Sequence, residues 1–101
     1  MGCRRPVKPQ GRYRGEVLGV PGAGWVWKGK VFTDDTVTNL ILGRELVEGR
    51  VAWDEDDLVW TITYPGGLID RLVEAEDQQG GYWGVMKLGW FAVWFRLTPW
   101  V

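Results

Sequence analysis

The sequence contains no histidine and no serine, and its only cysteine is Cys3. The lack of serine rules out a serine nucleophile, and the lack of histidine removes the commonest general base and the commonest metal ligand. A single cysteine forms no disulfide within the chain and builds no cysteine metal site. We therefore expect neither a metal centre nor a cofactor.

Long apolar runs are also missing. No stretch approaches the roughly 20 apolar residues that a membrane-spanning helix needs, and the first residues contain no apolar segment of the kind that a secretion signal carries. These absences predict a cytoplasmic protein without a membrane partner.

Charge is unevenly distributed. Residues 1–15 contain five basic side chains and no acidic one, whereas the rest of the chain contains seven basic and thirteen acidic side chains. A basic arm could contact nucleic acid or anionic lipid. Two prolines and the lack of an apolar run favour instead a solvated, flexible arm over residues 1–10. Basic residues are not interleaved with aromatic ones as a nucleic-acid platform requires, so we expect no nucleic-acid partner.

Aromatic residues are abundant: eight tryptophans, three tyrosines and three phenylalanines occur in 101 residues. Each such side chain buries roughly 150–250 Å², so together they can fill most of the interior of one small domain. A chain of this length is expected to form a single domain, here over residues 11–101.

Short segments of alternating apolar and polar residues recur between turn signals, which is the pattern of an all-β domain. Residues 58–64 are the clearest case. Residues 68–77 also fit a helical stripe, and we interpret them as a strand because strands surround them. The expected strands are 11–20, 25–33, 36–42, 45–53, 58–64, 68–77, 81–88 and 90–98.

Seven to eight short antiparallel strands predict a small β-barrel or half-open barrel, with a β-sandwich as the competing architecture. The interior of an eight-stranded barrel is either filled by side chains or holds one small ligand. The function therefore depends on whether this interior is open.

The segment WVWKGKVF, residues 25–32, raises that question directly. Strict alternation places Trp27 and Lys30 on opposite faces of the strand, with Trp27 in the core and Lys30 in solvent. A bulge at Gly29 would reverse the facing. Trp27 with Gly29 could form a stacking platform for a flat ligand, or Trp27 could plug one end of the barrel. With the bulge, Lys30 would reach the same pocket and act there as a base, an amine nucleophile or an anion clamp.

This segment also carries a resemblance to a known family. The motif W-x-G-K-x-F, followed by an acidic turn and V-x-N-L, resembles the GXWXG family of small bacterial proteins. Residues 61–97 resemble the domain of unknown function that usually follows this motif. The matches there are Tyr64, Ile69, Asp70, Gly84, Met86 and the aromatic run 90–95.

The resemblance covers roughly residues 25–98 and implies a lipocalin-like or nitrobindin-like β-barrel. The chain departs from the family pattern at Pro65 and Lys87, which stand where the family has aspartates. Nitrobindin-like barrels can hold haem. A proximal histidine is absent and Cys3 lies in the basic arm, so we expect no haem here.

Residues 90–98 carry large aromatic side chains on both faces, with Trp90 and Trp94 on one face and Phe91 and Phe95 on the other. One small core cannot bury both faces, so one of them covers a dimer partner or lines a ligand cavity. We predict a ligand site formed by Trp27, Gly29, Trp60, Met86, Trp90 and Trp94.

Three functions follow from this reading. The first is a protein that binds a small apolar or flat aromatic molecule. The second is a cyclase-type or isomerase-type enzyme that shapes an apolar substrate with Asp70, Lys30 and Tyr64 as its polar groups. Asp70 is then a catalytic acid or base, whereas otherwise it forms an ion pair with Arg71 or Lys30. The third is a homodimeric structural or interaction protein whose aromatic strand is the interface.

Overall fold

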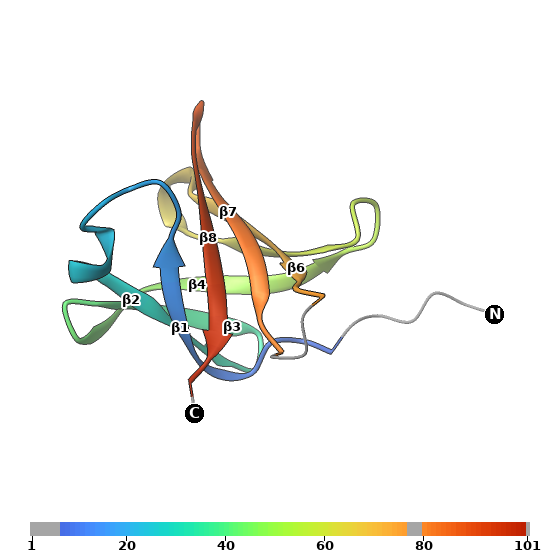
Figure 1. The fold of residues 1–101 in the computed structure, drawn as a ribbon. Coiled ribbons are helices and arrows are strands. Elements are labelled where there is room, and N and C mark those ends of the chain that lie inside the picture. The colour runs from blue at the N-terminus through green and yellow to red at the C-terminus, as the bar shows by residue number, and fades with distance from the viewer. Residues whose placement is uncertain (1–6, 77–79, 101) are drawn as a thin grey trace.

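The computed structural model describes residues 7–76 and 80–100, which form a closed antiparallel barrel of eight strands (Figure 1). Each strand pairs with the next, and β8 pairs with β1 to close the sheet. The strands are β1 (Gly11–Val17), β2 (Trp27–Thr33), β3 (Thr36–Ile41), β4 (Arg44–Asp54), β5 (Val59–Thr63), β6 (Ile69–Glu74), β7 (Tyr82–Leu88) and β8 (Phe91–Pro99). The predicted all-β barrel is confirmed, and the sandwich alternative is wrong.

The predicted strand over residues 25–33 begins too early. Ala23–Trp25 forms a short 3₁₀ turn between β1 and β2, closed by hydrogen bonds from the backbone of Trp25 to Gly22 and of Val26 to Ala23. These bonds keep the backbone from extending, so Trp25 lies on the surface in this connection and β2 starts two residues later. The ambiguous segment 68–77 is a strand over Ile69–Glu74, as predicted.

Side chains fill one end of the barrel. Because neighbouring strands run in opposite directions, the starts of β1, β3, β5 and β7 lie level with the ends of β2, β4, β6 and β8. Aromatic rings meet edge to face at this level, with centroid distances of 5.5 Å for Tyr13 and Phe32 and 5.6 Å for Tyr13 and Tyr82. The buried residues at this end are Tyr13, Phe32, Val37, Val51, Trp60, Leu72, Tyr82 and Leu97.

The last residues of the predicted N-terminal arm contact the barrel. Pro9 is fully buried, Lys8 forms an ion pair with Asp35, and the Tyr82 hydroxyl donates a 3.2 Å hydrogen bond to the carbonyl of Val7. Contacts with the barrel therefore begin before residue 11. The rest of the arm, residues 1–6, lies outside the described residues.

β2 is irregular at Gly29. Trp27 pairs with Ile41 and Gly29 pairs with Leu40, so two residue steps on β2 match one step on β3. Gly29 has a φ of 149°, and a Cβ atom added there would lie 1.9 Å from the carbonyl oxygen of Tyr13. Only glycine fits such a position. The irregularity reverses the alternation, so that Trp27 and Lys30 both line the barrel interior, which was the bulge alternative of the sequence analysis.

We expect Gly29→Ala to lower the free energy of unfolding by about 3 kcal/mol, because a Cβ atom there is strained and meets backbone of β1. Gly24→Ala is the matched control, since an added Cβ at Gly24 meets no atom within 4 Å. The control should change the stability by less than about 0.5 kcal/mol. Urea unfolding followed by tryptophan fluorescence measures both, and equal stabilities would contradict this account of the bulge.

Candidate ligand pocket

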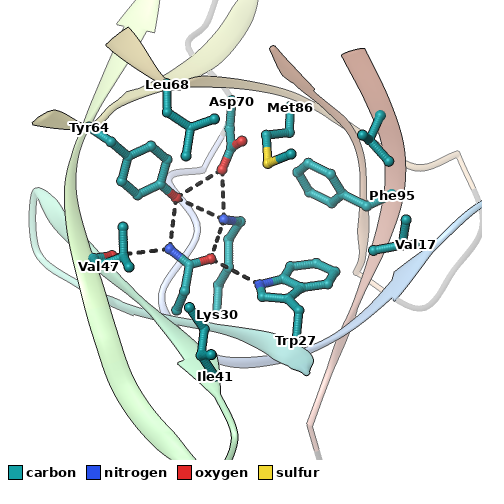
Figure 2. Close-up of a pocket in the computed structure, with 12 residues that line it drawn as sticks. Val17, Trp27, Lys30, Ile41, Val47, Tyr64, Leu68, Asp70, Met86 and Phe95 are labelled. Carbon is teal, nitrogen blue, oxygen red and sulfur yellow. Dashed lines mark hydrogen bonds and ion pairs between the residues drawn. The ribbon is translucent and has the colours of Figure 1, made fainter. Parts of the chain in front are cut away.

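The other end of the barrel holds a pocket of about 230 Å³. Its lining residues come from the ends of β1, β3 and β7, from the first halves of β2, β4, β6 and β8, and from Tyr64 and Leu68 in the connection between β5 and β6 (Figure 2). The lining residues are Val17, Trp27, Lys30, Asn39, Ile41, Val47, Tyr64, Leu68, Asp70, Met86, Val93 and Phe95. The barrel is therefore a cup, filled at one end and hollow at the other.

Four polar side chains lie together on one side of this largely apolar pocket (Figure 2). Lys30 comes from β2, Asn39 from β3 and Asp70 from β6, and Tyr64 follows β5 directly. All four are buried, with Lys30 only 3% and Asp70 only 1% exposed. Buried polar groups of this kind need hydrogen-bond partners.

The ammonium group of Lys30 lies at the centre of the cluster. Its Nζ forms an ion pair with Oδ2 of Asp70 at 2.6 Å and donates hydrogen bonds to Oδ1 of Asn39 at 2.7 Å and to the hydroxyl oxygen of Tyr64 at 2.8 Å. The rings of Trp27, Tyr64 and Phe95 surround it, with centroids 5.3 to 5.5 Å from Nζ. A buried cation is stabilised by both kinds of contact.

Further hydrogen bonds hold the partners of Lys30 in place. The Tyr64 hydroxyl donates to Oδ2 of Asp70 at 2.8 Å, and Trp27 Nε1 donates to Oδ1 of Asn39 at 3.0 Å. The side-chain amide of Asn39 donates to the Tyr64 hydroxyl and to the carbonyl of Val47, each at 3.1 Å. The cluster therefore links β2, β3, β4 and β6 across the hollow end.

Burial shifts the acid–base behaviour of two members. It lowers the pKa of Lys30, because removal from water penalises the charged ammonium, and the negative charge of Asp70 offsets part of this effect. It raises the pKa of Tyr64, and the Asp70 carboxylate raises it further. The phenol of Tyr64 therefore stays protonated and keeps its hydrogen bond to the carboxylate.

Two glycines make room for rings of the cluster. A Cβ atom at Gly49 would lie 2.6 Å from the ring of Tyr64, and one at Gly15 would lie 2.3 Å from the ring of Trp27. The β3–β4 register shifts between Leu46 and Gly49, next to the close approach at Gly49. Larger residues at these glycines would displace the rings that line the pocket.

The structure brings five of the predicted site residues together: Trp27, Lys30, Tyr64, Asp70 and Met86 all line the pocket. Asp70 forms an ion pair, with Lys30 as one of the two partners considered from the sequence. Gly29 is not a lining residue; it instead sets the backbone geometry that turns its neighbours inward.

Three predicted ligand residues lie elsewhere. Trp60 is buried at the filled end, with its ring centroid 5.0 Å from that of Trp53. Trp90, in the β7–β8 turn, is 94% exposed and Trp94 is 61% exposed on the outer face of β8. The sequence analysis chose the wrong face of this strand, since Phe95 points inward and lines the pocket.

Asn39 is the member of the polar cluster that the sequence analysis missed. It forms hydrogen bonds with Lys30 and Tyr64 of the cluster and accepts one from the indole of Trp27. Asparagine is depleted in strands, and alternation places Asn39 on the same face as Val37 and Ile41. An amide on an otherwise apolar strand face is a signal that could have identified it.

Comparisons of the chain with protein-family models, curated proteins and solved structures find no match. Membership of the GXWXG family and a lipocalin-like relationship therefore stay predictions, as does the cytoplasmic location. Within residues 7–76 and 80–100, no helix has the length and apolar character needed to span a membrane. The same residues contain no cluster of three potential metal ligands among histidine, cysteine, aspartate and glutamate.

The ion pair can be tested with a double-mutant cycle. Lys30→Met or Asp70→Leu alone leaves one buried charge without its partner, so each should lower the free energy of unfolding by about 3–5 kcal/mol. The double variant buries no charge, so it should be more stable by at least about 2 kcal/mol than the sum of the two single effects predicts. Chemical unfolding of the four proteins measures this coupling.

The matched control for this cycle is the ion pair between Arg71 and Asp57, whose atoms lie 2.9 Å apart but whose side chains are about half exposed. Arg71→Met and Asp57→Leu should each cost less than about 1 kcal/mol, because water screens an exposed pair. If the coupling energy of the buried pair is as small as that of the exposed pair, the ion pair between Lys30 and Asp70 does not stabilise the hollow end of the barrel.

Proposed function

We propose that this protein binds a small, largely apolar molecule in the hollow end of its barrel. The observation that carries the proposal is the pocket of about 230 Å³, in which apolar walls surround one convergent polar cluster. Ligand sites typically have this composition. An apolar cavity of about 150 Å³ is large enough for benzene, so the pocket suits a molecule of one or two rings.

The surface around the pocket mouth supports this proposal. The connections at that end carry exposed apolar residues, among them Val20, Trp25, Leu42 and Trp90. The turns at the filled end instead carry acidic residues, at positions 34–35 and 54–57. Apolar surface gathered at a cavity mouth favours the entry of an apolar ligand.

A cyclase or isomerase function is the second candidate for the same pocket. The observation in its favour is that Asp70, Lys30 and Tyr64 meet in one cluster. The hydrogen bonds among them hold these groups to one another, and this arrangement supports binding ahead of catalysis.

The binding proposal predicts that a hydrophobic fluorophore binds saturably to the folded protein and quenches Trp27. Val93→Trp should abolish this binding, because the new indole fills the pocket. Ala92→Trp is the matched control, since it adds the same side chain to the exposed face of β8 one residue away. Fluorescence titration of the three proteins measures the affinities.

Equal binding by the two variants, or no saturable binding by the folded wild-type protein, would refute the proposal. Mass spectrometry of the ligand recovered after incubation separates the two candidates. An unchanged ligand supports a binding protein, and a converted ligand supports the enzyme.

Self-association is a separate candidate role, for the outer surface. Trp83 and Trp94 expose aromatic area on the outer faces of β7 and β8, and Trp90 extends from the turn between them. Interfaces are rich in exposed aromatic residues of this kind. We propose a second copy of the chain as the partner.

The expected result is a dimer in light scattering at micromolar concentration, with Trp94→Lys shifting the protein to a monomer. Trp25→Lys, at an exposed tryptophan outside this surface, is the control and should leave the dimer intact. A wild-type monomer up to high micromolar concentration would count against a homodimer.

A further inference from the structure

The donor hydrogens of the polar cluster are all in use. Lys30 has three, which go to Asp70, Asn39 and Tyr64, and the amide of Asn39 has two, which go to Tyr64 and to the carbonyl of Val47. The single hydrogens of the Tyr64 hydroxyl and the Trp27 indole go to Asp70 and Asn39. The cluster therefore has no donor left to offer a ligand.

The acceptors are not all in use. Oδ2 of Asp70, Oδ1 of Asn39 and the hydroxyl oxygen of Tyr64 each receive two hydrogen bonds. Oδ1 of Asp70 receives none from the described part of the chain, although it is buried. A buried carboxylate oxygen without a hydrogen-bond partner is energetically costly. A ligand that donates a hydrogen bond to this oxygen would remove that cost.

This oxygen belongs to a side chain that lines the pocket. Asp70 is a lining residue, and Figure 2 shows it between Leu68 and Met86, with its second oxygen free of any dashed line. A ligand packed against these apolar neighbours would bring its polar edge to this oxygen.

Charge narrows the ligand class further. Among the described residues that line the pocket, Lys30 and Asp70 alone carry a full charge, and the two charges compensate one another. A charged ligand would add a charge that nothing in the lining balances, which is unfavourable in an apolar site. An anion would also find no free donor.

From these observations we infer that the pocket selects neutral one-ring or two-ring molecules that carry a hydrogen-bond donor, such as an indole N–H, and that the donor binds Oδ1 of Asp70. The inference rests on the proposed function, because it names the ligand class of the same pocket. The hydroxyl of a phenol and the N–H of an aromatic amide belong to the same class.

The test is a set of ligands of nearly equal size. Indole carries the donor, benzofuran replaces its N–H with an oxygen, and benzoate and benzylammonium carry charge. Isothermal titration calorimetry of the wild-type protein should show indole binding about 10-fold to 100-fold more tightly than benzofuran, the range of a hydrogen bond to a charged group. Benzoate and benzylammonium should bind more weakly than indole.

The variant Lys30→Met/Asp70→Leu removes the acceptor without leaving a buried charge. Its preference for indole over benzofuran should fall to within about 2-fold. Val93→Ala, which enlarges the pocket at β8, should change the affinity for both ligands and keep the preference. The wild-type comparison stands by itself if the double variant does not fold.

Each outcome decides the inference. Equal binding of indole and benzofuran overturns the inference but leaves the proposed function standing. This result is expected if a bound water already donates a hydrogen bond to Oδ1 of Asp70. Tightest binding of either charged ligand also overturns it. If no ligand of the set binds while the hydrophobic fluorophore does, the ligand class is wrong. If the fluorophore fails as well, the proposed function falls with it.

Discussion

The hollow end of this barrel depends on the buried ion pair between Lys30 and Asp70. Two opposite charges inside a small protein need each other and further hydrogen bonds, because an isolated buried charge costs several kcal/mol. Asn39 and Tyr64 meet that requirement for Lys30, and the Tyr64 hydroxyl binds the carboxylate in turn. The bonds fix one wall of the pocket, since each partner stands on a different part of the sheet.

The interiors of the two ends of the barrel are packed differently. At the filled end, apolar side chains from all eight strands interdigitate, and aromatic rings meet edge to face. At the hollow end, a hydrogen-bonded cluster stands among apolar lining residues such as Phe95 and Met86, and the space that these side chains leave open is the pocket. Neighbouring strands run in opposite directions. The start of one strand therefore meets the end of the next, and this pairing determines which residues lie at each end of the barrel.

Closure of the sheet also explains why so many tryptophans are exposed. Every strand has an inner and an outer face, and the inner faces of a small barrel hold few large rings. Trp27 and Trp60 occupy inner positions, whereas Trp83 and Trp94 lie on outer ones. The surplus aromatic surface that the sequence indicated is therefore divided between the core, the pocket wall and the outside of the molecule.

The sequence by itself determined the all-β architecture, because alternation and turn residues are local properties, and it identified Lys30, Tyr64 and Asp70 as polar residues in apolar strands. It could not decide whether they meet, since they lie up to 40 positions apart and only the pairing of strands brings them together. Only the tertiary structure decided that Trp27 and Lys30 face the same side of the strand. The carbonyl of Tyr13 on the neighbouring strand leaves no room for a side chain at Gly29, and the resulting irregularity turned both residues inward.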